Sequence, residues 1–239
     1  MTNIVDRWML RHRRQRDEWM DDPSLDADRH RLALRGLRRL NWISGVVAAM
    51  DRDLRRMVHP VPADRPLRLL DVASGSGDVA IELARRTGGR GRPVDLTTVD
   101  ISDVAIGVQR SAAQRAGIEL TALQMDVFVD SPPGRYDVAM CSLFFHHLCD
   151  EQSIDLIRRM RSIADAVLIC DLRRSRFNLT CVNTAAHLVS RSDVVHHDAD
   201  ASVRGAYSRA EFQSLADRAL GPRTAKVRPV FPCRMMLSF

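Results

Sequence analysis

The hydrophobic pattern between residues 66 and 171 alternates short apolar runs with stretches of helical periodicity. A short apolar run bounded by turn residues is typical of a buried strand, and apolar residues three and four positions apart are typical of a helix. Strands that alternate with helices indicate an α/β domain, in which helices cover both faces of a parallel sheet. The pattern predicts strands near 67–72, 95–100, 120–125, 137–142 and 166–171, and helices near 78–87, 102–116 and 151–164.

The segment before this core is predicted to form an N-terminal helical cap. A helix is expected from about Asp26 to Asn41, because the leucines there recur at helical spacing. A proline-rich stretch at 59–66 then connects the cap to the core. We therefore divide the chain into a cap, residues 1–65, and a core, residues 66–239.

An insertion after the fifth strand, residues 173–206, is predicted to cover the edge of the sheet as a lid. Its first part, 173–190, has helical periodicity and is expected to be a helix. The following stretch, 192–206, is polar and is expected to be a loop.

The end of the chain is expected to complete the sheet. A helix is predicted over 209–220, with Ser208 as its N-cap and Glu211 three residues later. Residues 224–230 and 233–239 are then expected to pair as a terminal hairpin. With this hairpin the sheet has seven strands and is mostly parallel.

The composition excludes several classes of protein. A chain of 239 residues suits one large domain with a cap better than two complete domains. The net charge is +6, but the arginines are interleaved with acidic residues, unlike the basic stripe of a nucleic-acid-binding protein. No apolar run approaches the ~20 residues of a membrane span. We therefore expect neither a nucleic-acid partner nor a transmembrane segment.

The cysteines indicate a reducing compartment. Their number is odd and none has the C-x-x-C spacing of a zinc or redox motif, which is typical of reduced, mostly buried thiols. The N-terminus also lacks the apolar core of a signal peptide, so we expect a cytoplasmic protein. The five cysteines are Cys141, Cys149, Cys170, Cys181 and Cys233.

The glycine-rich turn after the first strand is a candidate binding site, with the sequence Asp71-Val-Ala-Ser-Gly-Ser-Gly77. Glycines at positions 75 and 77 let a ligand approach the main chain closely. The turn also fits the G-x-G-x-x-A fingerprint of dinucleotide sites, but Asp71 would repel a pyrophosphate and attract an ammonium group. A ligand with an amino-acid tail and an adenosine body therefore suits the turn better.

Two further acids follow the next strands of the predicted sheet. Asp100 ends the second strand, and Asp126 ends the third. Because the ligand crevice of an open parallel sheet lies at the carboxyl ends of its strands, we expect both acids beside the glycine turn. A carboxylate at the position of Asp100 can accept hydrogen bonds from both hydroxyls of a ribose.

The turn at 71–77 resembles motif I of the class I S-adenosylmethionine-dependent methyltransferases, with Ala73 in place of the first glycine of that motif. Residues 136–148 resemble motif IV, and residues 39–57 resemble the segment before motif I in ubiquinone and menaquinone biosynthesis methyltransferases. The resemblance implies a Rossmann-like fold, S-adenosylmethionine as cofactor and a small-molecule acceptor. The cofactor-binding residues that it implies are Asp71, Ala73, Ser74, Gly75, Gly77, Asp100, Ile101, Asp126, Val127 and Cys141.

The histidines after the fourth strand are the candidate catalytic residues. His146 and His147 match the position at which some small-molecule O-methyltransferases of this class have a histidine base, and Asp171 matches the acid that orients it. We expect one of the two imidazoles, with some preference for His147, to take a phenolic proton while Asp171 holds the ring. The alternative is that the pair caps the next helix or packs on the cofactor.

No metal is expected at these histidines or at those of the lid, His187, His196 and His197. The reason is that no ligand set with suitable sequence spacing accompanies either group. The lid histidines are interpreted as surface or packing residues.

The predicted reaction is methyl transfer to a small, largely apolar acceptor, with the phenolic hydroxyl of a polyketide- or quinone-like metabolite as the expected target. C-methylation of a quinone precursor is the alternative within the family, and a non-catalytic nucleotide-binding partner subunit is the alternative outside it. A nucleic-acid acceptor is disfavoured, because Cys141-Ser-Leu-Phe144 stands where an Asn-Pro-Pro-Tyr type of motif would be expected. The oligomeric state is left open.

Overall fold

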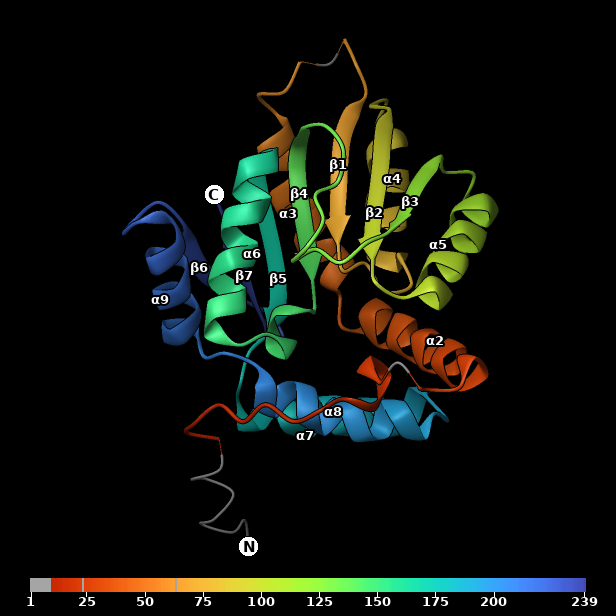
Figure 1. Cartoon of the computed structure of the whole chain (residues 1–239), viewed down its shortest axis with the longest axis vertical. Coiled ribbons are helices and arrows are strands. Elements are labelled where there is room, and N and C mark those ends of the chain that lie inside the picture. Colours follow the sequence, from red (N-terminus) through yellow and green to blue (C-terminus); the bar gives the residue numbers. More distant parts are fainter. Residues whose placement is uncertain (1–9, 23, 63) are drawn as a thin grey trace, which may run out of the picture.

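The computed structural model describes residues 10–22, 24–62 and 64–239. In this part of the chain seven strands form one sheet, in the order β3-β2-β1-β4-β5-β7-β6 (Figure 1). Strands β1 to β5 pair in parallel, and β7 runs antiparallel to both β5 and β6, which confirms the mostly parallel sheet. The strands are β1 (Leu67–Val72), β2 (Val94–Asp100), β3 (Leu120–Gln124), β4 (Tyr136–Ser142), β5 (Ala164–Leu172), β6 (Lys226–Val230) and β7 (Arg234–Ser238).

Helices cover both faces of the sheet, because successive residues of its central strands are buried on opposite sides. Leu70 points into an apolar cluster that includes Phe145 and Phe212, on the side of α6 and α9. Leu69 points into a second cluster that includes Met50, on the side of α3 and α4. The helices are η1 (Trp19–Asp21), α2 (Ala27–Ile43), α3 (Val46–Val58), α4 (Asp78–Gly88), α5 (Asp103–Ala116), η2 (Phe145–His147), α6 (Asp150–Ile163), α7 (Arg176–Val189), α8 (Asp193–Gly205) and α9 (Arg209–Leu220).

The two long helices before the core, α2 and α3, lie in different parts of the fold. Helix α2 begins after Asp26, whose side chain accepts hydrogen bonds from the main-chain N–H groups of Asp28 and Arg29. It lies with α7 and α8 at the carboxyl ends of the strands, below the sheet in Figure 1. Helix α3 instead packs on the sheet through Val46 and Met50. The first nine residues of the expected cap lie outside the described residues.

The prediction of a loop over 192–206 is wrong, because α8 occupies this stretch. The hydroxyl of Ser192 accepts a hydrogen bond from the Val195 N–H and caps the helix. Val194, Val195 and Ala199 are buried in a small cluster with residues of α2 and α7. The polar residues of α8 obscured this apolar face in the sequence, since Asp198 is itself buried rather than exposed.

The predicted end of the chain is confirmed. Ser208 and Glu211 form a reciprocal capping box at the start of α9. Strands β6 and β7 pair as the expected hairpin, in which Val230 lies opposite Arg234.

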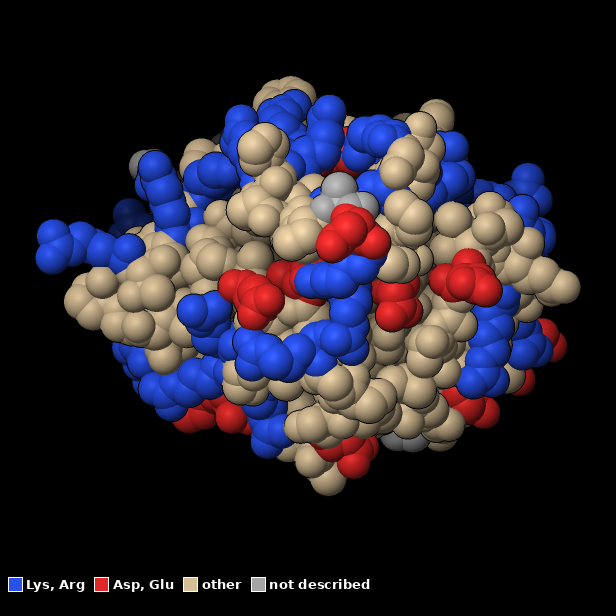
Figure 2. All heavy atoms as spheres, turned by 90° about the horizontal axis from the view of Figure 1, so that it is seen from above, with Lys and Arg blue, Asp and Glu red and all other residues tan. Residues whose placement is uncertain are grey.

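Charged side chains of both signs share the surface at the amino ends of the strands. Figure 2 shows this face, where arginine and lysine side chains lie among acidic ones and form no continuous stripe in this view. Arg65 pairs there with Asp137, and Arg135 pairs with Asp165.

None of the described helices is both long enough and apolar enough to cross a membrane.

The end of α8 lies directly against the loop after β4. A Cβ atom on Gly205 would lie 2.8 Å from the main-chain oxygen of His146, too close for a carbonyl oxygen that cannot rotate away. This contact leaves room only for glycine and places the last turn of α8 beside η2.

We predict that Gly205→Ala lowers the free energy of unfolding by about 1–3 kcal/mol, because the added methyl group forces α8 away from η2. Gly107→Ala is the matched control, since no atom lies within 4 Å of the Cβ position at Gly107 in α5. Alanine in a helix interior should leave stability unchanged or raise it. Chemical denaturation of both variants is the measurement, and equal stability would contradict the predicted clash.

Candidate active site

A cavity of about 1060 Å³ lies between the carboxyl ends of the parallel strands and the helices α2, α7 and α8. Its lining includes the glycine turn after β1 and also both histidines after β4. Because the strands run in parallel, segments that are far apart in the sequence end at this one edge. Most of the predicted cofactor residues and both predicted catalytic histidines therefore line one cavity.

The turn after β1 has three residues with positive φ: Ala73 (53°), Gly75 (54°) and Gly77 (70°). Alanine rarely adopts this left-handed conformation, which explains why a glycine is usual at the first of these positions. Gln109 holds the turn from α5, since its side-chain amide donates a 2.8 Å hydrogen bond to the Gly75 carbonyl and its amide oxygen accepts one from Thr98. The sequence analysis missed Gln109, which has no motif of its own.

Asp100 is joined to the turn by hydrogen bonds. Its carboxylate accepts one from the Gly75 N–H at 2.7 Å and another from the Ser102 N–H at 2.9 Å. Burial raises the pKa of Asp100, although these two hydrogen bonds oppose the shift. The carboxylate lines the cavity and is held at a fixed place beside the turn.

Most of the predicted cofactor residues line the cavity: Ala73, Ser74, Gly75, Asp100, Ile101, Asp126 and Val127. Gly77 and Cys141 do not line it. Gly77 starts α4, and a Cβ atom there would lie 2.9 Å from Gln109. Cys141 is buried in the apolar cluster of α6 and α9, and burial raises the pKa of its thiol.

Asp71 also lies outside the cavity lining, as a carboxylate that is only 1% exposed. Its Oδ1 has no hydrogen-bond partner among the described residues. Burial, together with the nearby carboxylates of Asp78 and Asp100, raises the pKa of Asp71 well above its ordinary value. An unpartnered buried oxygen is costly, so this position favours a ligand group that donates a hydrogen bond.

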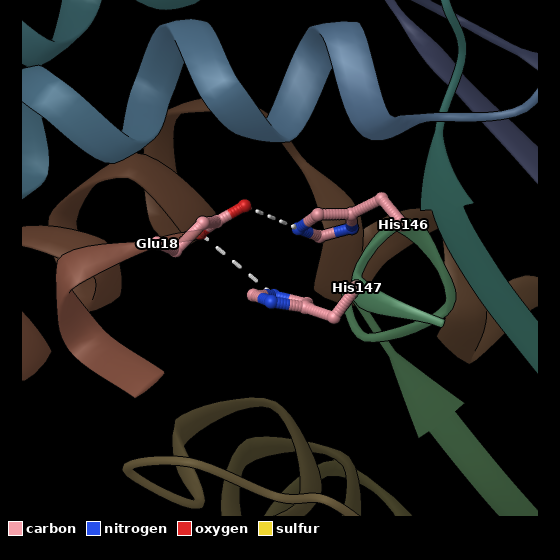
Figure 3. Close-up of side chains that lie close together, drawn as sticks. All are labelled: Glu18, His146 and His147. Carbon is pink, nitrogen blue, oxygen red and sulfur yellow. Dashed lines mark ion pairs between the residues drawn. The ribbon is translucent and has the colours of Figure 1, made fainter. Parts of the chain in front are cut away.

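Glu18, His146 and His147 lie together at the other end of the cavity, and we call these three residues the histidine centre (Figure 3). His146 is 5% exposed. Its Nδ1 lies 2.7 Å from Asp171 Oδ1, and its Nε2 lies 3.8 Å from Glu18 Oε1. Burial alone would raise the pKa of Asp171, but the His146 imidazole outweighs burial and lowers it.

His147 has a similar environment, with a different carboxylate behind its ring. Its Nδ1 lies 2.7 Å from Asp21 Oδ2, and its Nε2 lies 3.8 Å from Glu18 Oε2. Burial opposes the charge on this ring, but Glu18 and Asp21 outweigh it and raise the pKa of His147 to about 9. Burial raises the pKa of Glu18, and the Ser202 hydroxyl donates a 2.8 Å hydrogen bond to its carboxylate.

The structure corrects two expectations about these residues. Asp171 orients His146, whereas the sequence analysis preferred His147 as the ring that it holds. The reasoning that no ligand set accompanies the histidine pair is also wrong, because the carboxylate of Glu18 and both imidazoles lie within 4.8 Å of one another. Sequence spacing could not show this, since Glu18 comes from a segment more than a hundred residues earlier.

The lid histidines take other partners. The rings of His187 and His196 lie 4.1 Å apart, and the ring of His197 stacks on Trp19 at 4.2 Å. No carboxylate joins the His187–His196 pair in any metal-ligand group of the described residues. These contacts support the interpretation of the lid histidines as packing residues.

The segment that carries Glu18 and Asp21 is held in place at both ends. Arg13 donates hydrogen bonds from its guanidinium to the main-chain oxygens of His146, Leu148 and Gly205. The N–H groups of Trp19 and Met20 donate to the carboxylate of buried Asp198 in α8. The centre is therefore assembled from the N-terminal segment, the β4 loop and α8.

Comparison with known proteins finds similarity to methyltransferases. Residues 69–166 match the family model described as a methyltransferase domain. A demethylmenaquinone methyltransferase of Thermus thermophilus is 28% identical over 97 residues, which are 40% of this chain and 42% of that protein. The chain thus matches about two fifths of the length of this curated relative.

Solved structures extend the similarity to the whole fold. The plantazolicin methyltransferase BpumL, in complex with a triazolic desmethylPZN analog and SAH, has a TM-score of 0.69 at 16% identity, over 92% of each chain. Magnesium protoporphyrin IX methyltransferase from Synechocystis PCC 6803, with bound SAH, has a TM-score of 0.53 at 17% identity, over 98% of this chain and 92% of that one. Residues 69–166 thus resemble a methyltransferase domain, and the chain as a whole has the fold of these solved methyltransferases.

Proposed function

We propose that the protein transfers a methyl group from S-adenosylmethionine to the hydroxyl of a small, largely apolar acceptor such as a phenol. The observation that carries this proposal is the single cavity, in which the glycine turn and Asp100 face the same space as the histidine centre. The structural neighbours add support, since BpumL and the protoporphyrin methyltransferase were both crystallised with SAH.

The residues at one end of the cavity fit S-adenosylmethionine. The carboxylate of Asp100 would accept hydrogen bonds from the ribose hydroxyls, and Ile101, Asp126 and Val127 would line the adenine position. The amino-acid tail of the cofactor would lie along the turn after β1, where Ala73, Ser74 and Gly75 line the cavity. When bound, the cofactor supplies an electrophilic methyl group on a positively charged sulfur.

The other end of the cavity fits an apolar acceptor with one ionisable group. Apolar side chains from the cap, the β4 loop and α7 line it: Leu37, Leu143, Phe144, Val182 and Ala185. A cavity near 1000 Å³ has room for a drug-sized ligand, and this one must hold a cofactor and an acceptor side by side. The acceptor's hydroxyl would face the histidine centre.

The chain has two tasks in this reaction. The cavity must align the acceptor oxygen with the methyl carbon, because methyl transfer is an in-line displacement that depends on orientation. The hydroxyl must also lose its proton. We assign that proton to Nε2 of His146, since Asp171 fixes the ring through Nδ1 and leaves Nε2 directed at the cavity.

C-methylation of a quinone precursor is the second candidate function. The observation that favours it is the similarity to a demethylmenaquinone methyltransferase. We place either activity in the cytoplasm, because all five cysteines are free thiols.

We predict that Asp100→Ala weakens S-adenosylmethionine binding by about 5- to 150-fold, the loss expected for ~1–3 kcal/mol of hydrogen bonding to a charged group. Asp95→Ala is the control, because Asp95 lies exposed near the opposite end of the same strand. Isothermal titration calorimetry measures both affinities. An unchanged affinity of the Asp100 variant would remove Asp100 from the cofactor site.

We predict that His146→Ala lowers the turnover rate by about 10²- to 10⁴-fold, because the acceptor loses the group that takes its proton. Affinity for S-adenosylmethionine should stay within about twofold, since His146 lies at the acceptor end of the cavity. The assay follows product mass across a panel of phenols, quinols and catechols. His187→Ala is the control, and normal turnover by the His146 variant would reject the assignment.

A further inference from the structure

The histidine centre has the geometry of a set of metal ligands. The carboxylate of Glu18 lies 3.8 Å from Nε2 of His146 and 3.8 Å from Nε2 of His147. Two ligand atoms of a tetrahedral zinc site lie about 3.3 Å apart, as follows from metal–ligand bonds of about 2.0–2.1 Å. The two distances involve different oxygens of Glu18, and the ligand atoms of the three residues lie within 4.8 Å of one another. Shifts of up to about 1.5 Å through side-chain rotation would bring them to the spacing of a zinc site.

The hydrogen bonds behind both rings direct the same nitrogen toward the centre. Asp171 accepts from Nδ1 of His146, and Asp21 accepts from Nδ1 of His147. A carboxylate at Nδ1 is the usual outer partner of a metal-binding histidine, and it leaves Nε2 as the ligand atom. Figure 3 shows both rings pointing toward Glu18, so the two Nε2 atoms and the carboxylate face one region.

The charges of the centre favour a cation at that point. The carboxylates of Glu18, Asp21 and Asp171 surround the two imidazoles, and Glu18 and Asp171 are buried. Buried charge is costly unless it is paired. A divalent cation would offset the negative charge of these carboxylates and would supply an electrophile to the Glu18 carboxylate and to both Nε2 atoms.

We propose that Glu18, His146 and His147 bind a divalent transition-metal ion of the Zn²⁺ type, with one coordination position open to the cavity. Two imidazoles and one carboxylate are the ligand set of several catalytic zinc sites. Magnesium and calcium prefer oxygen ligands, which argues against them here. All three residues line the cavity, so the fourth position is accessible to the acceptor.

This inference rests on the proposed function for its consequence, because the open position lies where the acceptor's hydroxyl is placed. A hydroxyl bound to the ion loses its proton to water more readily, since the metal stabilises the oxyanion. A lone pair of that oxygen then forms the bond to the methyl carbon as the carbon–sulfur bond breaks, and the sulfur leaves as a neutral thioether. In the metal-bound centre, coordination thus replaces proton transfer to His146, contrary to the expectation that no metal is needed.

The experiment uses the full-length protein without a histidine tag, stripped of metal by a chelator. Titration with Co²⁺, followed by its visible absorption, and then with Zn²⁺ as competitor should show one site per chain with a tetrahedral spectrum. Glu18→Gln should weaken binding by more than about 100-fold, and Asp171→Asn by about 10- to 100-fold, as is typical of an outer partner. His187→Ala with His196→Ala is the matched control, because this histidine pair has no accompanying carboxylate.

Two results would overturn the metal site: stoichiometric binding absent from the wild-type protein, or binding reduced equally in the control variant. The first of these results comes from the wild-type protein alone, so it does not depend on whether the variants fold. The same preparations are tested with S-adenosylmethionine by calorimetry and with the phenol panel. Stripped protein that transfers methyl groups at the full rate rejects the part of the metal in the reaction and retains the proposed function, whereas protein that binds zinc but not S-adenosylmethionine rejects the proposed function alone.

Discussion

The parallel pairing of β1 with β2 on one side and β4 on the other is the constraint on which the site depends. It brings the carboxyl ends of these strands to one edge, so that the glycine turn, Asp100 and the histidine loop face a common space. Helices pack both faces of the sheet and leave this edge as the place where polar groups can meet. The topology of the sheet therefore determines where the cavity lies.

The N-terminal segment adds further residues to the site at this sheet edge. It contributes Glu18 and Asp21, and it is held by Arg13 on one side and by Asp198 of α8 on the other. The segment therefore closes the cavity at the histidine centre and also supplies two of the three carboxylates around the imidazoles. This links the cap to the chemistry, because any movement of the cap changes the charges that face the histidines.

The parts of the fold that could be predicted are those with a local signal. The strand ends at Val72 and Asp100 and the capping box at Ser208 follow from short patterns that the structure confirms. Helix α8 was missed because its inward-facing Asp198 made an apolar face look polar. The partners of the two histidines were missed for a different reason: Glu18 approaches them only through tertiary packing, which no spacing in the sequence records.

The central claim is that this sheet edge binds S-adenosylmethionine beside an acceptor centre. Calorimetric titration of the wild-type protein with S-adenosylhomocysteine and, separately, with NAD tests it most directly, because the glycine turn fits the fingerprints of both ligand classes. The account predicts one binding site per chain for S-adenosylhomocysteine and no measurable binding of NAD, since the chain has the fold of methyltransferases that were crystallised with SAH. Binding of NAD without S-adenosylhomocysteine would contradict it.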